Sequence, residues 1–170
     1  VFSCDDILKE VPKDRISEAN FYKTVSDGRA AVDAIYGVLS AGQLFAHQYL
    51  LQIEIPADFA YGRGSTMPIG GEYTGLDAVN QRRVGLMWDY FYRAVNYANI
   101  AIEKIPGIEG DESAKTALVA EAKFLRALCY YHLVRDFGSV PLRLNSTDGD
   151  MARTPVADVY TTALDDLQAA

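Results

Sequence analysis

The sequence predicts an all-α protein, built mainly of helical pairs, with one long irregular segment between its first two helices. Apolar residues recur with the 3.6-residue period of a helix along four stretches of the chain, and glycine or proline marks the ends of most of them. The chain has 170 residues, of which 49% are hydrophobic. That composition is enough for one domain with a sizeable core.

The first helix is predicted from about Asp27 to Ser40. Thr24 and Asp27 have the spacing of a capping box, in which each side chain bonds to the backbone N–H of the other at the helix start. Gly42 is placed to end this helix. The face expected to be buried carries Ala31, Ala34, Ile35 and Val38.

The second helix is predicted from about Gln81 to Ile105, and Pro106-Gly107 ends it because proline cannot continue a helix. Its inward stripe includes the single tryptophan of the chain, which we interpret as a core residue and not as an exposed platform for a sugar. The stripe consists of Val84, Trp88, Phe91, Val95, Ala98, Ile102 and Ile105.

The third helix is predicted from about Ser113 to Asp136, with Gly138 as its C-terminal cap. Its inward residues are Leu118, Leu125, Cys129, His132 and Leu133. The fourth helix is predicted to begin at Thr154-Pro155, a capping hydroxyl followed by proline at the first helical position. It is expected to bury Val156, Tyr160, Ala163 and Leu167.

A loose internal repeat joins two of these helices. Similar segments begin at Tyr92 and Tyr160, 68 residues apart, which is twice the roughly 34-residue period of tetratricopeptide repeats. Tetratricopeptide-like helical pairs each leave an apolar face that a neighbouring pair or another domain must cover.

The charge of the chain excludes one class of function and disfavours another. A formal net charge of −7 and a pI near 4.8 argue against binding of nucleic acid, which requires clustered Lys and Arg. The same acidic balance disfavours electrostatic docking on anionic lipid.

The sequence gives little support to catalysis. His47 and His132 are the only histidines, and the chain has no H-E-x-x-H, C-x-x-C, G-x-S-x-G or phosphate-loop motif. We interpret His132 as a hydrogen-bonded histidine of the core or of a groove. Asp165 and Asp166 point about 100° apart on a helix, so they cannot flank one glycosidic bond and are predicted to form a solvated face. We expect no enzyme activity, no metal and no cofactor.

Residues 56–80 form a glycine-rich segment with isolated aromatic residues, and a loop of this length in a compact domain is usually functional or disordered. Carbohydrate binding needs an aromatic face to stack on a sugar ring and polar groups to bond its hydroxyls. The segment supplies both, and the predicted ligand-binding residues are Tyr61, Arg63, Tyr73, Asp77 and Asn80, with Phe59 as a second choice. In the alternative interpretation, these aromatic residues only pin the loop onto the helices.

Several motifs, in a fixed order, resemble the SusD/RagB glycan-binding lipoproteins of Bacteroidetes. Residues 121–142 fit E-A-x-F-L-R-A-x-x-Y-x-x-L followed by F-G-x-V-P-L. Residues 88–99 fit W-x-x-x-Y-x-x-I-x-x-A-N, with Val95 at the isoleucine position. Residues 153–160 fit R-T-P-x-x-E-V-Y, with Asp158 in place of glutamate, and residues 4–13 are similar to the acidic, leucine-bearing stretch after the family's lipid-anchored cysteine.

The resemblance implies a fold and a function. It implies a SusD-like N-terminal region, with residues 1–20 as lipoprotein anchor and extended tether and residues 21–170 as a helical domain truncated at its C-terminus. Cys4, preceded by a small residue as at a lipoprotein processing site, would carry the lipid. Arg126 and Asn99 match motif positions and are interpreted as buried polar groups that tie helices together, because a buried charge must be paired.

The implied role is nutrient binding at the cell surface. A lipid anchor in the outer membrane would hold the protein beside a SusC-like TonB-dependent transporter, to which it delivers an oligosaccharide or another nutrient. Two alternatives stay open: a helical-repeat adaptor that binds only protein, and a glycan-processing enzyme whose catalytic residues lie beyond residue 170.

Overall fold

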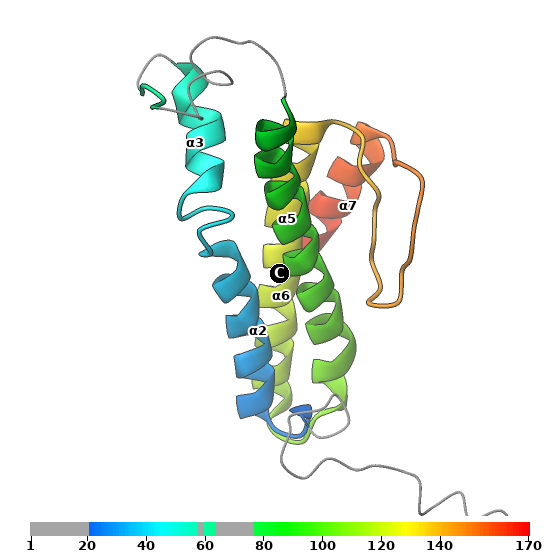
Figure 1. Ribbon diagram of the computed structural model, residues 1–170. Coiled ribbons are helices and arrows are strands. Elements are labelled where there is room, and N and C mark those ends of the chain that lie inside the picture. Colours follow the sequence, from blue (N-terminus) through cyan, green and yellow to red (C-terminus); the bar gives the residue numbers. More distant parts are fainter. Residues whose placement is uncertain (1–20, 58–59, 64–76) are drawn as a thin grey trace, which may run out of the picture.

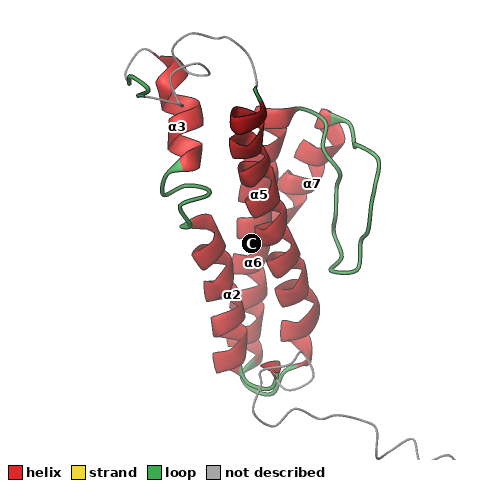
Figure 2. Ribbon diagram, viewed as in Figure 1, coloured by secondary structure: helices red, strands yellow, loops and turns green. Residues whose placement is uncertain are grey.

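The chain folds into long helices joined by loops (Figures 1 and 2). The computed structural model describes residues 21–57, 60–63 and 77–170. The helices are α2 (Val25–Leu39), α3 (Gln48–Glu54), α5 (Ala78–Lys104), α6 (Glu112–Phe137) and α7 (Val156–Gln168), with 3-10 turns η2 (Ile55–Ala57) and η4 (Ile105–Gly107). No strand occurs in these described ranges, so the all-α prediction is confirmed.

The four longer helices alternate in direction along the chain and stack in chain order (Figure 1). Helix α6 lies at the centre, where it packs against α2, α5 and α7, and α2 also packs against α5. The core lies between these helices, and its largest fully buried side chains are Tyr130, Phe91, Ile35, Leu44, Ile105, Leu125 and Leu133.

The start of α2 confirms the predicted capping box. The Oδ2 atom of Asp27 accepts the backbone N–H of Thr24 at 2.8 Å, and the hydroxyl of Thr24 accepts the backbone N–H of Asp27 at 3.4 Å. The helix ends at Leu39, before the predicted stop at Gly42. Gly28 faces the core, where a Cβ atom would lie 3.1 Å from Leu118, so a small residue allows α2 to approach α6 closely.

The predicted glycine cap of α6 is confirmed at Gly138, where the chain turns away from the bundle. Gly138 has a φ of 71° and a ψ of −130°, a conformation that residues with a Cβ rarely adopt. The chain that follows Gly138 is held by the buried Tyr130 on α6. The Tyr130 hydroxyl donates to the carbonyl of Arg143 and accepts the N–H of the same residue, both at 2.7 Å. Tyr92 donates to the carbonyl of Pro141 at 2.7 Å, so α5 and α6 together fix this exit.

Substitution of Gly138 by alanine is expected to lower the free energy of unfolding by about 1–3 kcal/mol through backbone strain. Nothing lies within 4 Å of the added Cβ, so the loss would report the backbone conformation and not a clash. Gly37→Ala is the matched control: it lies in α2 with the same open space, and alanine there should raise stability by about 0.5–1 kcal/mol. Chemical denaturation measures the free energy of unfolding of both variants. A loss of stability in Gly37→Ala as large as that in Gly138→Ala would contradict the explanation by backbone strain.

Arg126 is a buried charged residue that bonds to side chains on two other helices. These bonds confirm the prediction that Arg126 and Asn99 tie helices together. Its guanidinium donates to both carboxylate oxygens of Asp166 on α7, at 2.7 and 2.8 Å. The Nη1 atom also donates to the Oδ1 atom of Asn99 on α5 at 2.8 Å and to the carbonyl of Leu144 at 3.2 Å. The interpretation of Asp165 and Asp166 as a solvated face is therefore wrong for Asp166, which is 6% exposed because Arg126 neutralises it.

Helix α7 buries only part of the predicted stripe: Ala163 is buried and Tyr160 packs partly buried against the core, as predicted, but Val156 and Leu167 do not face it. Val156 and Leu167 are 38% and 46% exposed, whereas Val159 is fully buried and Ala163 nearly so. The predicted Thr154 cap is also wrong, because the N-cap residue is Pro155 and no side chain caps the helix. Apolar residues lie on two faces of α7, and the face that carries Asp166 turns to α6 because Arg126 lies there.

Helix α3 was not predicted. It has seven residues and no side-chain cap at its start, too little for a periodic signal. Tyr49 holds it to the bundle, since its ring packs at 4.9 Å from Phe45 and 5.8 Å from Phe91. Leu50 and Ile53 on the same helix are 50% and 41% exposed.

Candidate functional site

The described part of the predicted ligand-binding segment lies between α3 and the start of α5, at one end of the bundle (Figure 1). Tyr61 is 70% exposed, and Arg63 and Asp77 are also exposed. Asn80 lies within the first turn of α5 and not in a loop, because this helix begins three residues earlier than predicted. Tyr73, Phe59 and the predicted anchor Cys4 lie outside the described residues.

An aromatic and polar cluster adjoins α3, which leads into this segment. The Tyr49 hydroxyl lies 2.6 Å from the Nδ1 atom of His132 on α6. The imidazole ring stacks on Phe91 with centroids 5.7 Å apart and meets the edge of Phe45 at 5.1 Å. His132 is thus a partly buried, hydrogen-bonded histidine at the core, in line with the prediction of a core or groove histidine, and the cluster fixes α3 against α5 and α6.

Burial controls the ionisation of this cluster. It lowers the pKa of His132, an effect to which the positive charge of Arg135 adds. It raises the pKa of Asp136 and raises the pKa of Tyr49 to about 12. These shifts favour the uncharged forms of His132 and Tyr49, and a neutral imidazole can accept a hydrogen bond from the Tyr49 hydroxyl at Nδ1.

Acidification from about pH 7 to about pH 5 is expected to destabilise the fold through His132. Because the folded protein has the lower histidine pKa, it binds the proton less readily than the unfolded chain, so stability falls as pH falls through the ordinary imidazole range. Asp136, whose pKa is raised, acts in the opposite direction when it protonates. His132→Asn should lose less stability over this range than the parent protein, measured by denaturant unfolding at both pH values.

The exposed His47 provides the control for this prediction. His47→Asn should keep the pH dependence of the parent protein, since that side chain lies on the surface at the start of α3. Equal pH dependence of the His132→Asn variant and the parent would show that His132 does not carry the effect.

Trp88 packs against the core, as predicted, and is half-buried. Its ring lies 4.8 Å from Tyr92 and meets the edge of Phe137 at 5.1 Å. The tryptophan therefore braces α5 against the end of α6, where the chain turns at Gly138.

The remaining chemistry of the described residues is sparse. Cys129 is a free, fully buried thiol whose pKa burial raises to about 12, so it is packed as a small apolar side chain. Within the described ranges, no three side chains of His, Cys, Asp or Glu gather in a way that could hold a metal ion. The described helices include none that is long and apolar enough to cross a membrane.

The described structure is therefore a stack of antiparallel helices with exposed aromatic and charged side chains, Tyr61, Arg63 and Asp77, at one end. Comparison with known proteins gives the family. The family model described as "Starch-binding associating with outer membrane" (SusD-like_3) matches residues 57–170, more than half of the chain. The chain belongs to this SusD-like family.

Individual relatives agree with this assignment. SusD-like protein P25 of Formosa agariphila is 31% identical over 98% of the chain. A SusD superfamily protein from Bacteroides thetaiotaomicron superposes on 87% of the chain with a TM-score of 0.73 and 25% identity. A laminarin-binding SusD-like protein does so over 87% with a TM-score of 0.70 and 26% identity. The chain spans about a third of each of these proteins, at 34%, 35% and 34% of their lengths.

Proposed function

We propose that this protein is a non-catalytic, cell-surface lipoprotein that captures an oligosaccharide and delivers it to a TonB-dependent outer-membrane transporter. The observation that carries the proposal is Tyr61, a residue that is 70% exposed within a segment of a SusD-like chain. A relative of similar fold is described as laminarin-binding, which supports a glycan as the ligand.

The proposed binding mode uses the chemistry of residues 61–80. The flat face of Tyr61 would stack on the apolar face of a sugar ring. Arg63 would donate hydrogen bonds to sugar hydroxyls, and Asp77 would accept them. Tyr73 and Asn80 are proposed to complete the contacts. Binding and release require no bond to be broken, and the cluster of Tyr49 and His132 would hold α3 and the start of the segment in place.

The proposed attachment uses the N-terminal segment. A lipid on Cys4 would anchor the protein in the outer membrane, residues 1–20 would form the tether, and residues 21–170 would form the N-terminal helical domain of a longer protein. Part of the helical scaffold would face the SusC-like transporter, and the acidic balance of the chain, with its net charge of −7, is consistent with an anchor that does not depend on anionic lipid.

Affinity gel electrophoresis of the full-length mature protein against a panel of polysaccharides tests the proposal. Laminarin and starch belong in the panel because related proteins are described by them. We expect retardation by at least one glycan. Migration that no glycan alters would contradict glycan capture and favour the helical-repeat adaptor. Release of reducing sugar by the full-length protein would favour the glycan-processing enzyme.

A further inference from the structure

Helix α3 is attached to the bundle mainly through one side chain. It has seven residues, and no side chain caps its start. The structure describes all of α3, and Tyr49 is its one buried residue, whereas Leu50 and Ile53 are exposed. A helix this short is marginal by itself, so the contacts of Tyr49 largely decide whether α3 stays on the bundle.

The Tyr49 contact depends on an acceptor that can be ionised. The Tyr49 hydroxyl lies 2.6 Å from the Nδ1 atom of His132 on α6. The imidazole ring is enclosed by the rings of Phe45 and Phe91, at 5.1 and 5.7 Å. A neutral imidazole can accept the Tyr49 hydrogen bond, but a protonated one has a hydrogen on both nitrogens and accepts none. Protonation of His132 would therefore remove the acceptor of Tyr49 inside an aromatic enclosure.

Two polar groups at this contact already lack a partner. In the described ranges, the Oδ2 atom of Asp136 and the Oε1 atom of Gln48 are buried without a hydrogen bond. Gln48 belongs to α3, and Asp136 lies one turn beyond His132 on α6, close enough to interact with Tyr49. An unsatisfied buried acceptor costs free energy, and water would reach both groups if α3 left the bundle. The docked position of α3 is therefore favoured by only a small margin.

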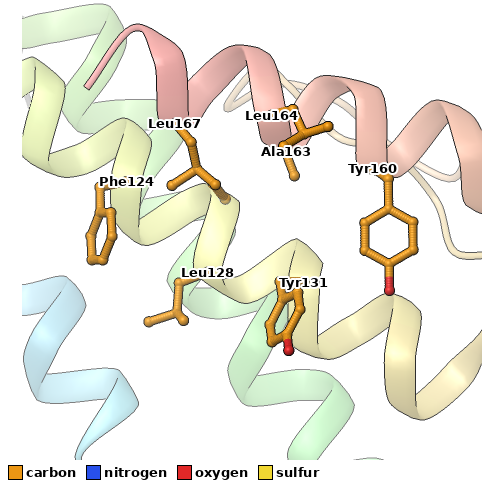
Figure 3. Close-up of a pocket in the computed structure, with 8 residues that line it drawn as sticks. Phe124, Leu128, Tyr131, Tyr160, Ala163, Leu164 and Leu167 are labelled. Carbon is orange, nitrogen blue, oxygen red and sulfur yellow. The ribbon is translucent and has the colours of Figure 1, made fainter.

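The charges that act on the contact come from α6. Arg135 opposes a positive charge on His132, and Asp136 acts on the Tyr49 hydroxyl. Tyr131, whose hydroxyl accepts a bond from Arg135 at 3.1 Å, also lines the apolar groove between α6 and α7 (Figure 3). Where the chain is described, α5 and the loop before α3 meet the imidazole with aromatic rings alone. A proton on His132 is thus less favourable in the docked form than in an open form, where water surrounds the ring.

We propose that the bond between Tyr49 and His132 is a pH switch, which holds α3 on the bundle while His132 is neutral and releases this helix when His132 takes a proton. Release would leave α2, α5, α6 and α7 packed, since their core lies elsewhere. α3 leads into the exposed residues 60–63, so its release would also free the start of that segment. The switch needs no ligand and is independent of what the segment binds.

Acid favours the open form of this switch. Burial lowers the pKa of His132 in the docked form, whereas an imidazole in water has an ordinary pKa of about 6.5. The docked form therefore loses stability relative to the open form as pH falls through about 6.5. The loss at about pH 5 is at most about thirtyfold in the docking equilibrium, since it grows at most tenfold for each pH unit. Asp136 opposes this loss when it protonates, because burial raises its pKa.

Hydrogen exchange of the full-length protein at about pH 7 and about pH 5 tests the switch. Protection factors, corrected for the intrinsic exchange rate at each pH, are compared between α3 and the buried part of α5. At the higher pH we expect α3 to be less protected than α5. Acidification should then lower the protection of α3 about tenfold. In His132→Asn, acid should cause no such loss, and slow exchange in α5 would show that the variant is folded.

Two further variants identify the titrating group. Asp136→Asn removes the opposing carboxyl, so its α3 should lose more protection in acid than α3 of the parent protein. His47→Asn should match the parent, because His47 is exposed.

Three results would overturn the inference. Equal protection of α3 and α5 at both pH values would show that α3 opens only when the whole protein unfolds. Protection of α3 that acid does not lower in the parent protein would show that no such switch operates. A parent-like loss in His132→Asn, or no loss in Asp136→Asn, would assign the pH dependence to a group other than His132.

Discussion

Replacement of Arg126 by alanine is expected to lower the free energy of unfolding by about 3–5 kcal/mol, because it leaves a buried carboxylate without its cation. Arg126 and Asp166 are 7% and 6% exposed, and their bidentate contact joins α6 to α7. The same guanidinium bonds to Asn99 on α5 and to the carbonyl of Leu144 in the loop after α6. The variant would therefore also lose the contacts that hold α5 and this loop to α6. Chemical denaturation measures the loss.

Two further variants separate burial from charge. Arg29→Ala removes the contact to Glu121 at 2.6 Å, but these side chains are 40% and 30% exposed, so the loss should stay below about 1 kcal/mol. The double variant Arg126→Met with Asp166→Leu removes both buried charges and should recover most of the stability. Similar losses for Arg126→Ala and Arg29→Ala would contradict the central role of Arg126.

Phe91→Ala is expected to cost about 3–5 kcal/mol, the range for removal of a buried phenylalanine that leaves a cavity. Phe91 is fully buried in α5, and its ring lies 5.8 Å from Phe45 and Tyr49 and stacks on His132. The cavity would open under α3, so this short helix should lose protection from hydrogen exchange before the rest of the bundle.

The control for Phe91 lies on the same helix. Tyr97 is 38% exposed, and Tyr97→Ala should cost about 1 kcal/mol or less. Denaturant unfolding compares the two variants. Equal losses, or an α3 whose hydrogen exchange is unchanged in Phe91→Ala, would show that Phe91 does not hold α3 to the bundle.

Features that depend on a few neighbouring residues could be predicted from the sequence. Thr24 and Asp27 bond to each other within one helical turn, and Gly138 adopts a backbone conformation that favours glycine. Neither feature depends on a distant residue, so both could be predicted from neighbouring positions in the sequence. The burial of Arg126 and Asn99 was predicted by resemblance to SusD/RagB motifs and is confirmed.

Features set by distant contacts could not be predicted. Asp166 is paired with a residue 40 positions away, and hydrophobic periodicity carries no information about such a partner. The same contact selects which face of α7 is buried, so Val156 and Leu167 were assigned to the wrong side. α3 depends on Tyr49 and its distant neighbours Phe91 and His132, and its seven residues are too few for a periodic pattern.

Only part of the candidate site could be predicted from the sequence. Composition identified the 56–80 segment, and the structure places Tyr61, Arg63 and Asp77 on the surface at one end of the bundle. The neighbouring cluster of Tyr49, His132 and Asp136 was missed as a group because it joins α3 to α6 across more than 80 residues, as the 83-residue separation of Tyr49 and His132 shows. The role of the five predicted ligand-binding residues remains a proposal.

Isothermal titration of the full-length protein with an oligosaccharide of the glycan that retards it would test the central claim most directly. Tyr61→Ala and Tyr73→Ala would be compared with the parent and with Tyr97→Ala, a partly exposed tyrosine on α5 away from the segment. Loss of a stacking ring should weaken binding about tenfold in the segment variants and leave Tyr97→Ala unchanged. Parent-like affinity in both segment variants would contradict a glycan site at residues 61–80.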